Sequence, residues 1–190
     1  MARIVVTEFV SLGGVMQAPG GDEYFKHAGW TFEIERGAEG DKFKLDETLA
    51  SEALLLGRVT YEGFAKAWPS MKDEFGFAEK FNSMREYVVS STLKKAEWTN
   101  STILSGDVVK EVTQLRERLD GDIVVHGSAE LVQTLVEHDL VDELRLMVFP
   151  VVLGRGKRLF ADTSDKKPMR LIDSQMVGDG VAILTYQRAS

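Results

Sequence analysis

The sequence predicts an α/β fold in which parallel strands with helical crossovers come first and antiparallel strands come last. Leu54–Leu56 and Ile123–Val125 are short, continuously apolar runs, which are typical of strands buried on both faces of a parallel sheet. A glycine follows each run closely, and apolar residues at helical spacing come next. Near the end of the chain, Gly178-Asp179-Gly180 separates two strand-like segments, which predicts an antiparallel hairpin formed by residues 169–177 and 181–188.

Length and composition restrict the classes of protein to consider. A chain of 190 residues with 44% hydrophobic and 28% charged residues is expected to fold as one soluble domain. Its formal net charge of -7 makes nucleic acid an unfavourable partner. The absence of cysteine excludes disulfides, thiolate metal sites and a cysteine nucleophile, and no metal site is expected. No run approaches the roughly 20 apolar residues of a membrane span, and no signal peptide is recognised, so a cytoplasmic location is expected.

The chain is expected to begin with a strand at Arg3–Leu12, which stops at Gly13-Gly14. A loop that contains glycine and proline, LGGVMQAPGG at 12–21, follows this strand. A loop of this composition beside a central strand is either a mobile lid over a pocket or a plain surface connection.

The middle of the chain is expected to alternate between helices and short strands. Asp46 is expected to be the N-cap of a helix that precedes the buried strand Leu54–Leu56. A second helix follows Gly57 and ends at Pro69. The remaining elements expected here are a helix at 77–84, strands at 86–89 and 102–104, and a helix at 108–119.

Residues 122–135 form the clearest strand–turn–helix unit. Gly127 breaks the apolar run, and Ser128 is expected to be the N-cap of a helix that starts at Ala129. Free N–H groups at such a helix start can bind an anion, and a glycine lets a phosphate come close. The unit can equally be an ordinary connection between a strand and a helix, and it lacks a full GxGxxG fingerprint.

After this unit the pattern becomes that of a long strand, expected at Asp142–Leu153. Pro150 bends this strand or marks it as an edge strand. Glu143 and Arg145 alternate along it, so they are expected to face solvent or a partner.

Three predicted strand ends are expected to meet at one edge of the sheet, because the strands are parallel. They carry Gly57–Thr60, Ser90–Thr92 and His126–Ala129. An arginine, a cluster of hydroxyl groups and a glycine turn at one edge are suited to binding phosphate groups. The sequence therefore favours nucleotide binding.

Four segments resemble the dihydrofolate reductase-like superfamily, and more closely the family of the C-terminal reductase domain of the riboflavin-pathway deaminase-reductase (the RibD C-terminal family). These segments are LLLGRVTYE at 54–62, YVVSSTL at 87–93, IVVHGSAELVQTL at 123–135 and DELRLMVFPVVLGRGKRLF at 142–160. The resemblance implies one domain over residues 1–190, with a three-layer α/β/α fold and a mixed sheet. It also implies an NADPH-dependent reductase that transfers a hydride to a small planar heterocycle, such as a pterin or a pyrimidine.

The resemblance assigns roles to residues at the strand ends. The nicotinamide would contact Val10, Ser11, Val15 and Met16. The phosphates would contact Gly57, Arg58, Val59 and Thr60, and the adenosine ribose with its 2′-phosphate would contact Ser90, Ser91 and Thr92. The pyrophosphate would lie on Gly127, Ser128, Ala129, Glu130 and Leu131. The substrate would contact Phe9, Gln17, Tyr61 and Trp68, although core packing is an equal alternative for the last two. His126 would bond the cofactor or act as an acid, or it would be a packed imidazole.

The sequence also departs from the family pattern. Many relatives carry Ser-Leu-Asp-Gly after the first strand, whereas this chain has Ser11-Leu12-Gly13-Gly14 and so lacks the aspartate. Dihydrofolate reductases place a carboxylate in the helix before the second strand, and the nearest candidate here is Asp46. Gln17 is the other catalytic candidate. No Cys/His zinc set is present, so the sequence lacks the fused deaminase.

Two classes of function remain open, a reductase and an NADPH- or nucleotide-binding protein with little turnover, which would act as a sensor or carrier. The missing acid favours the second class. The partners expected are a small-molecule substrate and a second copy of the chain, which would pair through the C-terminal strands.

Overall fold

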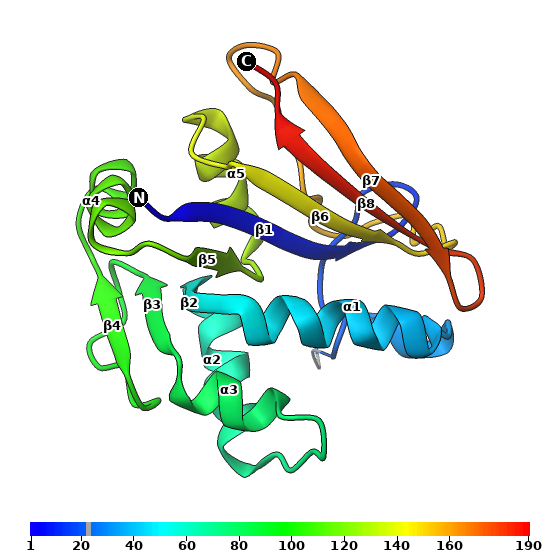
Figure 1. Ribbon diagram of the computed structural model, residues 1–190, viewed down its shortest axis with the longest axis horizontal. Coiled ribbons are helices and arrows are strands. Elements are labelled where there is room, and N and C mark those ends of the chain that lie inside the picture. Colours follow the sequence, from blue (N-terminus) through cyan, green and yellow to red (C-terminus); the bar gives the residue numbers. More distant parts are fainter. Residues whose placement is uncertain (22–23) are drawn as a thin grey trace.

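The computed structural model describes residues 1–21 and 24–190 and shows an α/β fold built on one mixed sheet (Figure 1). The strand order is β4-β3-β2-β5-β1-β6-β8-β7. Strands β1 to β6 pair in parallel, whereas β8 pairs antiparallel with both β6 and β7. The predicted mixed sheet and C-terminal hairpin are therefore confirmed. The strands are β1 (Arg3–Val10), β2 (Ser51–Gly57), β3 (Arg85–Val89), β4 (Ser101–Leu104), β5 (Asp122–Val125), β6 (Glu143–Val148), β7 (Met169–Val177) and β8 (Val181–Arg188).

Helices cover both faces of the sheet and give the predicted three layers (Figure 1). On one face, α4 and α5 pack against Ile4 and Val6 of β1. On the other face, α2 and α3 pack against Val5 and Leu54, because successive side chains of a strand point to opposite faces. None of the described helices is long and apolar enough to cross a membrane. The α-helices are α1 (Gly37–Ala50), α2 (Arg58–Ala67), α3 (Phe77–Ser83), α4 (Val108–Arg118) and α5 (Ala129–Glu137), and short 3-10 helices lie at Trp30–Glu33 and Trp68–Ser70.

Helix α1 starts much earlier than the sequence predicts. It begins at Gly37, so Asp46 lies inside the helix, where its exposed side chain pairs with Lys42. The prediction that Asp46 is an N-cap is therefore wrong. The sequence hides this helix because it opens with two glycines, which are weak helix formers. In addition, its buried positions include polar residues where an apolar stripe is expected, namely Lys44, Glu47 and Thr48.

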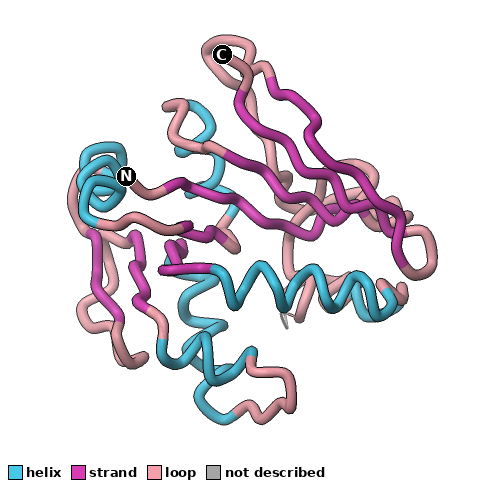
Figure 2. Tube along the Cα trace, in the orientation of Figure 1, coloured by secondary structure: helices cyan, strands magenta, loops and turns pink. Residues whose placement is uncertain are grey.

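Strand β6 is shorter than predicted, because the chain leaves the sheet after Val148. Pro150 has no N–H group to donate to a neighbouring strand, and residues 149–168 are irregular (Figure 2). This segment pairs with the loop after β1. The N–H of Leu12 donates to Val151 and that of Met16 donates to Lys157, both at 2.9 Å. These bonds support a fixed connection rather than a mobile lid for residues 12–16.

Candidate active site

The turns after β2 and β5 lie against each other at one edge of the sheet. The strands are parallel neighbours, and the N–H of Gly57 donates to the carbonyl oxygen of Gly127 at 3.0 Å. The hydroxyl groups of Thr60 and Ser128 are 3.2 Å apart across the same contact. A Cβ atom on Gly57 would lie 2.6 Å from Ser128 Oγ, and one on Gly127 would lie 2.8 Å from Thr60 Oγ1. Close packing of the two turns therefore requires glycine at both positions, and Gly127 also has a φ of +119°.

Two helices start at this edge without a side-chain cap. Helix α2 begins at Arg58 and α5 at Ala129, each directly after one of the turns. Ser128 occupies the N-cap position of α5, but its hydroxyl group makes no capping hydrogen bond, so the predicted cap is wrong in this respect. By contrast, Asp107 caps α4 by accepting a hydrogen bond from the N–H of Lys110 at 2.8 Å. The first-turn N–H groups of α2 and α5 therefore keep donor capacity that suits an anion.

The third predicted strand end, Ser90–Thr92, lies beside the first. Gly57 pairs with Val89 in the sheet, so Arg58 and Ser90 come next on neighbouring strands. The buried hydroxyl group of Ser90 accepts hydrogen bonds from two N–H groups of its own turn, at 3.2 and 2.9 Å. Ser91 and Thr92 are exposed, and the half-exposed guanidinium of Arg58 pairs with Glu62 at 3.0 Å. The structure thus brings the three predicted strand ends together.

The predicted cofactor-binding residues divide into a buried and an exposed set. The hydroxyl group of Ser11 accepts a hydrogen bond from the N–H of Val15 at 3.0 Å and fixes the turn after β1. The methyl group of Met16 is 3.5 Å from the position that a Cβ on Gly127 would take. Buried members are Val10, Ser11, Val15, Met16, Gly57, Ser90, Gly127, Ala129 and Leu131, exposed members are Arg58, Val59, Ser91, Thr92 and Glu130, and Thr60, His126 and Ser128 are partly exposed.

The two catalytic candidates use their side chains elsewhere. The side-chain oxygen of Gln17 accepts a hydrogen bond from the backbone N–H of Lys157 at 3.0 Å. The backbone carbonyl oxygen of Gln17 accepts one from the indole N–H of Trp30 at 2.9 Å. Asp46 is exposed on α1 and pairs with Lys42. Gln17 therefore holds the loop after β1, and Asp46 is a surface residue.

Of the predicted substrate residues, Tyr61 and Trp68 belong to the core between α2, α3 and the sheet. The hydroxyl group of Tyr61 donates to Ser101 at 3.0 Å and accepts from the N–H of Trp98 at 3.1 Å. The Trp68 ring centroid lies 4.5 Å from that of Phe81. Core packing, the alternative considered for both residues, is therefore the arrangement observed.

Phe9 has different surroundings, since two cations lie near its ring. The ammonium nitrogen of Lys44 is 5.1 Å from the ring centroid, and the guanidinium carbon of Arg36 is 5.5 Å from it. Phe149 contacts the same ring edge to face, with centroids 5.7 Å apart. These distances are typical of cation–π contacts. They place two positive charges beside the Phe9 ring, near the end of β1.

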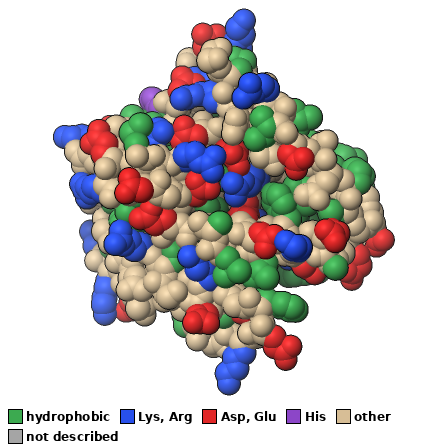
Figure 3. All heavy atoms as spheres, in the orientation of Figure 1, with side chains coloured by type: hydrophobic (Ala, Val, Ile, Leu, Met, Phe, Trp, Pro, Cys, Tyr) green, Lys and Arg blue, Asp and Glu red, His purple; other side chains and the backbone are tan. Residues whose placement is uncertain are grey.

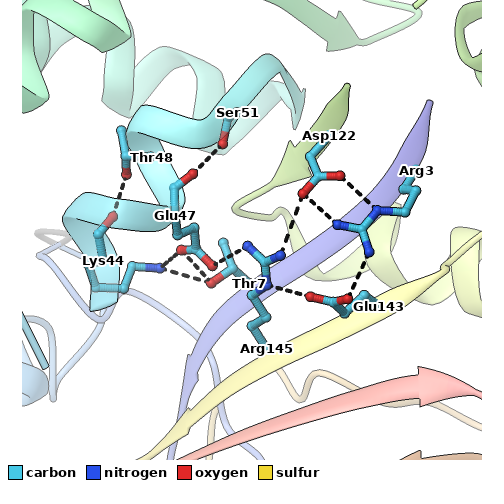
Figure 4. A network of polar contacts seen from close by, with 9 residues as sticks. All are labelled: Arg3, Thr7, Lys44, Glu47, Thr48, Ser51, Asp122, Glu143 and Arg145. Carbon is cyan, nitrogen blue, oxygen red and sulfur yellow. Dashed lines mark hydrogen bonds and ion pairs between the residues drawn. The ribbon is translucent and has the colours of Figure 1, made fainter. Parts of the chain in front are cut away.

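A network of charged side chains joins α1 to strands β1, β5 and β6 (Figure 4). Lys44 donates to Thr7 at 2.9 Å and to the carboxylate of Glu47. Arg145 contacts the second oxygen of Glu47 at 3.4 Å and pairs with Glu143 at 2.7 Å. Arg3 and Asp122 complete the network. Glu143 is buried and Arg145 is mostly covered, so the prediction that they face solvent or a partner is wrong.

Glu47 stays ionised within this network. Burial alone would raise the pKa of its carboxyl group, but the positive charge of Lys44 and the hydrogen bond from it hold that pKa below the usual value. The sequence analysis missed Lys44 and Glu47. Their spacing of three residues on one helix was the available sign of a pair.

His126 is a packed, neutral imidazole. Its ring centroid lies 5.6 Å from that of Phe64 and 5.9 Å from that of Phe81. Burial, with the nearby charge of Lys44, lowers its pKa to about 3. The neutral ring keeps one N–H group, but the lowered pKa argues against His126 as an imidazolium acid at neutral pH.

Glu8 is a buried acid that the sequence analysis also missed, although it is the one carboxylate inside the apolar run of β1. Among the described residues, none forms a hydrogen bond with its Oε1 atom. Burial and the charge of Glu47 raise its pKa well above the usual value, and Lys44 only partly opposes them. Burial therefore favours the protonated form of this carboxyl group.

The chain is similar to proteins of one family. The family model of the RibD C-terminal domain matches residues 2–183. The uncharacterized protein YyaP of Bacillus subtilis is 28% identical over 138 residues, which cover 71% of this chain and 73% of YyaP. The structure of a candidate riboflavin biosynthesis protein from Shewanella superposes with a TM-score of 0.80 and 21% identity, covering 100% of both chains. Dihydrofolate reductase from Enterococcus faecalis, complexed with NADP(H), superposes with a TM-score of 0.58 and 15% identity, covering 99% of this chain and 97% of that one. This chain belongs to the RibD C-terminal domain family and has a dihydrofolate reductase-like fold.

Proposed function

We propose that this protein is an NADPH-dependent reductase that transfers a hydride to a small planar heterocycle. The observation that carries the proposal is the meeting of two uncapped helix starts, at Arg58 and Ala129, on adjacent strand ends. Membership of the RibD C-terminal domain family supports it, and so does the likeness of fold to a dihydrofolate reductase complexed with NADP(H). The same edge suits a sensor or carrier, and the exposed position of Asp46, where it pairs with Lys42, favours that second candidate.

The residues at this edge fit the phosphate groups of NADPH. First-turn N–H groups of α2 and α5 would hold the pyrophosphate, with the hydroxyl groups of Thr60 and Ser128 between them. Arg58, with Ser91 and Thr92, would hold the 2′-phosphate. The hydroxyl group of Ser90 is already occupied by its own turn, so it would shape this site rather than contact the cofactor.

NADPH, when bound, supplies the hydride, and the protein orients the reactants. Among the residues that the structure describes, Lys44 donates two hydrogen bonds, to Thr7 and Glu47, so its third N–H would be available to an acceptor on the substrate. Phe9 offers a ring face beside the same ammonium group. Neutral His126 adds a flat, uncharged surface. These residues would orient a planar heterocycle that carries a carbonyl group.

NADPH is expected to bind more tightly than NADH, because charge-assisted hydrogen bonds to the 2′-phosphate contribute about 1.5–3 kcal/mol each. Arg58→Ala should remove most of this preference, by about tenfold or more in affinity. Fluorescence titration with both cofactors measures it. Lys66→Ala is the matched control, since Lys66 is an exposed cation in the last turn of the same helix and should leave both affinities unchanged. Equal affinity of the wild-type protein for the two cofactors would contradict the assignment.

Turnover separates the reductase from the sensor or carrier. Steady oxidation of NADPH in the presence of a pterin, a pyrimidine or a related heterocycle supports the enzyme. Tight binding of NADPH without oxidation by any of them supports the second candidate.

The surface is suited to a small-molecule substrate and a second copy of the chain. On the face shown in Figure 3, acidic and basic side chains are interspersed, which argues against nucleic acid as a partner. Strand β7 is the last strand of the sheet, and it exposes Leu171, Ile172 and Met176. An edge strand with exposed apolar side chains favours pairing with a second chain.

We expect a twofold dimer that uses β7, so the protein should sediment at twice the mass of the 21.2 kDa chain. Ile172→Lys should shift it to the monomer, because it places a charge in the apolar contact. Met71→Lys changes an equally exposed apolar residue in the connection between α2 and α3, and it should leave the dimer intact. A wild-type monomer at micromolar concentration would contradict this expectation.

A further inference from the structure

The side chain of Glu8 lies beneath the glycine turn after β5. In the parallel register of β1 and β5, Val6 pairs with Val125, so Glu8 is level with Gly127 two residues further along. Its Oε1 atom is 3.8 Å from the position that a Cβ on Gly127 would take. The methyl group of Met16 lies 3.5 Å from the same point. Three segments thus meet at Gly127, and one of them brings a carboxyl group.

A carboxyl group is unfavourable at this position, because the side chains of this central strand are otherwise packed in an apolar core. The neighbouring residues Ile4, Val5 and Val6 are fully buried and apolar, and Glu8 is only 6% exposed. No described residue satisfies Oε1, and a buried polar atom without a partner is costly. Oε1 of Glu86 is the other such atom among the described residues, but it lies near the start of β3, whereas Oε1 of Glu8 lies beside the Gly127 turn of the proposed cofactor site. The surface that it faces is the turn at the start of α5.

We propose that Glu8 is a cofactor-binding residue whose buried carboxyl group donates a hydrogen bond to an oxygen atom of NADPH on the Gly127 turn. The inference rests on the proposed NADPH site. A neutral carboxylic acid has one O–H to donate, whereas a carboxylate has none and repels phosphate. The acceptor is either a pyrophosphate oxygen or the carboxamide oxygen of the nicotinamide.

Binding of NADPH should then weaken as pH rises, because ionisation of Glu8 removes the donor. The charged groups that act on Glu8 are Lys44 and Glu47 of α1, which bond Thr7 on the opposite face of β1. Glu47 and His126 have lowered pKa values, so neither changes its charge between neutral and alkaline pH. Glu86 provides a control, since burial raises its pKa to about 8, but it lies near the start of β3 and its Oε2 accepts a hydrogen bond from Ser101 at 3.0 Å.

The test is the dissociation constant of NADPH, measured by fluorescence titration from neutral to alkaline pH in four proteins. The wild-type protein and Glu86→Gln should lose affinity in parallel as pH rises. Glu8→Gln keeps an N–H donor, so it should bind NADPH like the wild type at neutral pH. Because the amide does not ionise, its affinity should fall less than that of the wild type as pH rises. Glu8→Leu should bind about tenfold more weakly at neutral pH, the loss expected for one hydrogen bond to a charged or strongly polar acceptor. Circular dichroism and melting temperature check that each variant is folded.

The outcomes separate this inference from the proposed function. If the wild type binds NADPH but folded Glu8→Leu binds it equally well, or Glu8→Gln keeps the wild-type pH profile, Glu8 is not a donor and the cofactor site stands. If the wild type does not bind NADPH at any pH, both ideas fail. The analogue 2′-phospho-ADP-ribose, which lacks nicotinamide, identifies the acceptor. A loss of its affinity in Glu8→Leu assigns the pyrophosphate, and an unchanged affinity assigns the carboxamide.

Discussion

Replacing Glu47 with leucine is expected to lower the free energy of unfolding by about 3–5 kcal/mol, because it leaves buried cations without their carboxylate. Lys44 is buried, and its ammonium group donates to Glu47 and Thr7. The second oxygen of Glu47 lies 3.4 Å from the guanidinium of Arg145. Urea-induced unfolding, analysed by its midpoint and slope, measures the change.

Two control variants show whether burial causes this loss. Lys44→Met combined with Glu47→Leu removes both charges, so it should recover most of the stability, since an apolar pair of similar volume replaces the ion pair. The exposed pair Lys42–Asp46 lies on the same helix, and Asp46→Ala should cost much less stability because solvent screens that pair. A cost of Glu47→Leu no larger than that of Asp46→Ala would show that the network contributes little.

The same network explains why part of the fold could not be predicted from the sequence. The strand at Asp122–Val125 and the final hairpin follow from local apolar runs and turn glycines, and both are found where the sequence predicts them. Helix α1 does not follow, because its buried side chains include Lys44 and Glu47, which are stabilised by Thr7 and Arg145 from distant strands. Pairings across such sequence separations leave no periodic pattern.

The candidate site divides in a similar way. Parallel strands place their carboxyl ends at one edge, so the meeting of Gly57 and Gly127 could be predicted from the order of elements. The contact of Gly127 with Thr60 could not, because it depends on how two helix starts pack. Glu8 was hidden by the apolar run around it, since a strand pattern shows which face a residue occupies but not whether its side chain finds a partner.

Replacing Gly127 with alanine is expected to abolish NADPH binding, with a loss of about 3 kcal/mol or more, which is roughly a hundredfold or more in affinity. A Cβ atom at this position would lie 2.8 Å from Thr60 Oγ1, so the turns at the starts of α2 and α5 must separate. The N–H groups that would hold the pyrophosphate move apart with them. The φ of +119° adds strain of about 1–3 kcal/mol, so the melting temperature should also fall while the circular dichroism spectrum stays native.

Two further variants decide which of these effects prevents binding. Thr60→Ala combined with Gly127→Ala removes the clashing oxygen, so it should recover part of the stability, but the added methyl group still lies where the phosphate must approach, and binding should stay abolished. Thr60→Ala alone measures the contribution of that hydroxyl group. Ser128→Ala should cost less stability than the roughly 0.5–2 kcal/mol of a lost N-cap, because the hydroxyl group contacts Thr60 rather than capping α5. If the folded double variant binds NADPH like the wild type, Gly127 serves only to pack the two turns, and the cofactor site must lie elsewhere.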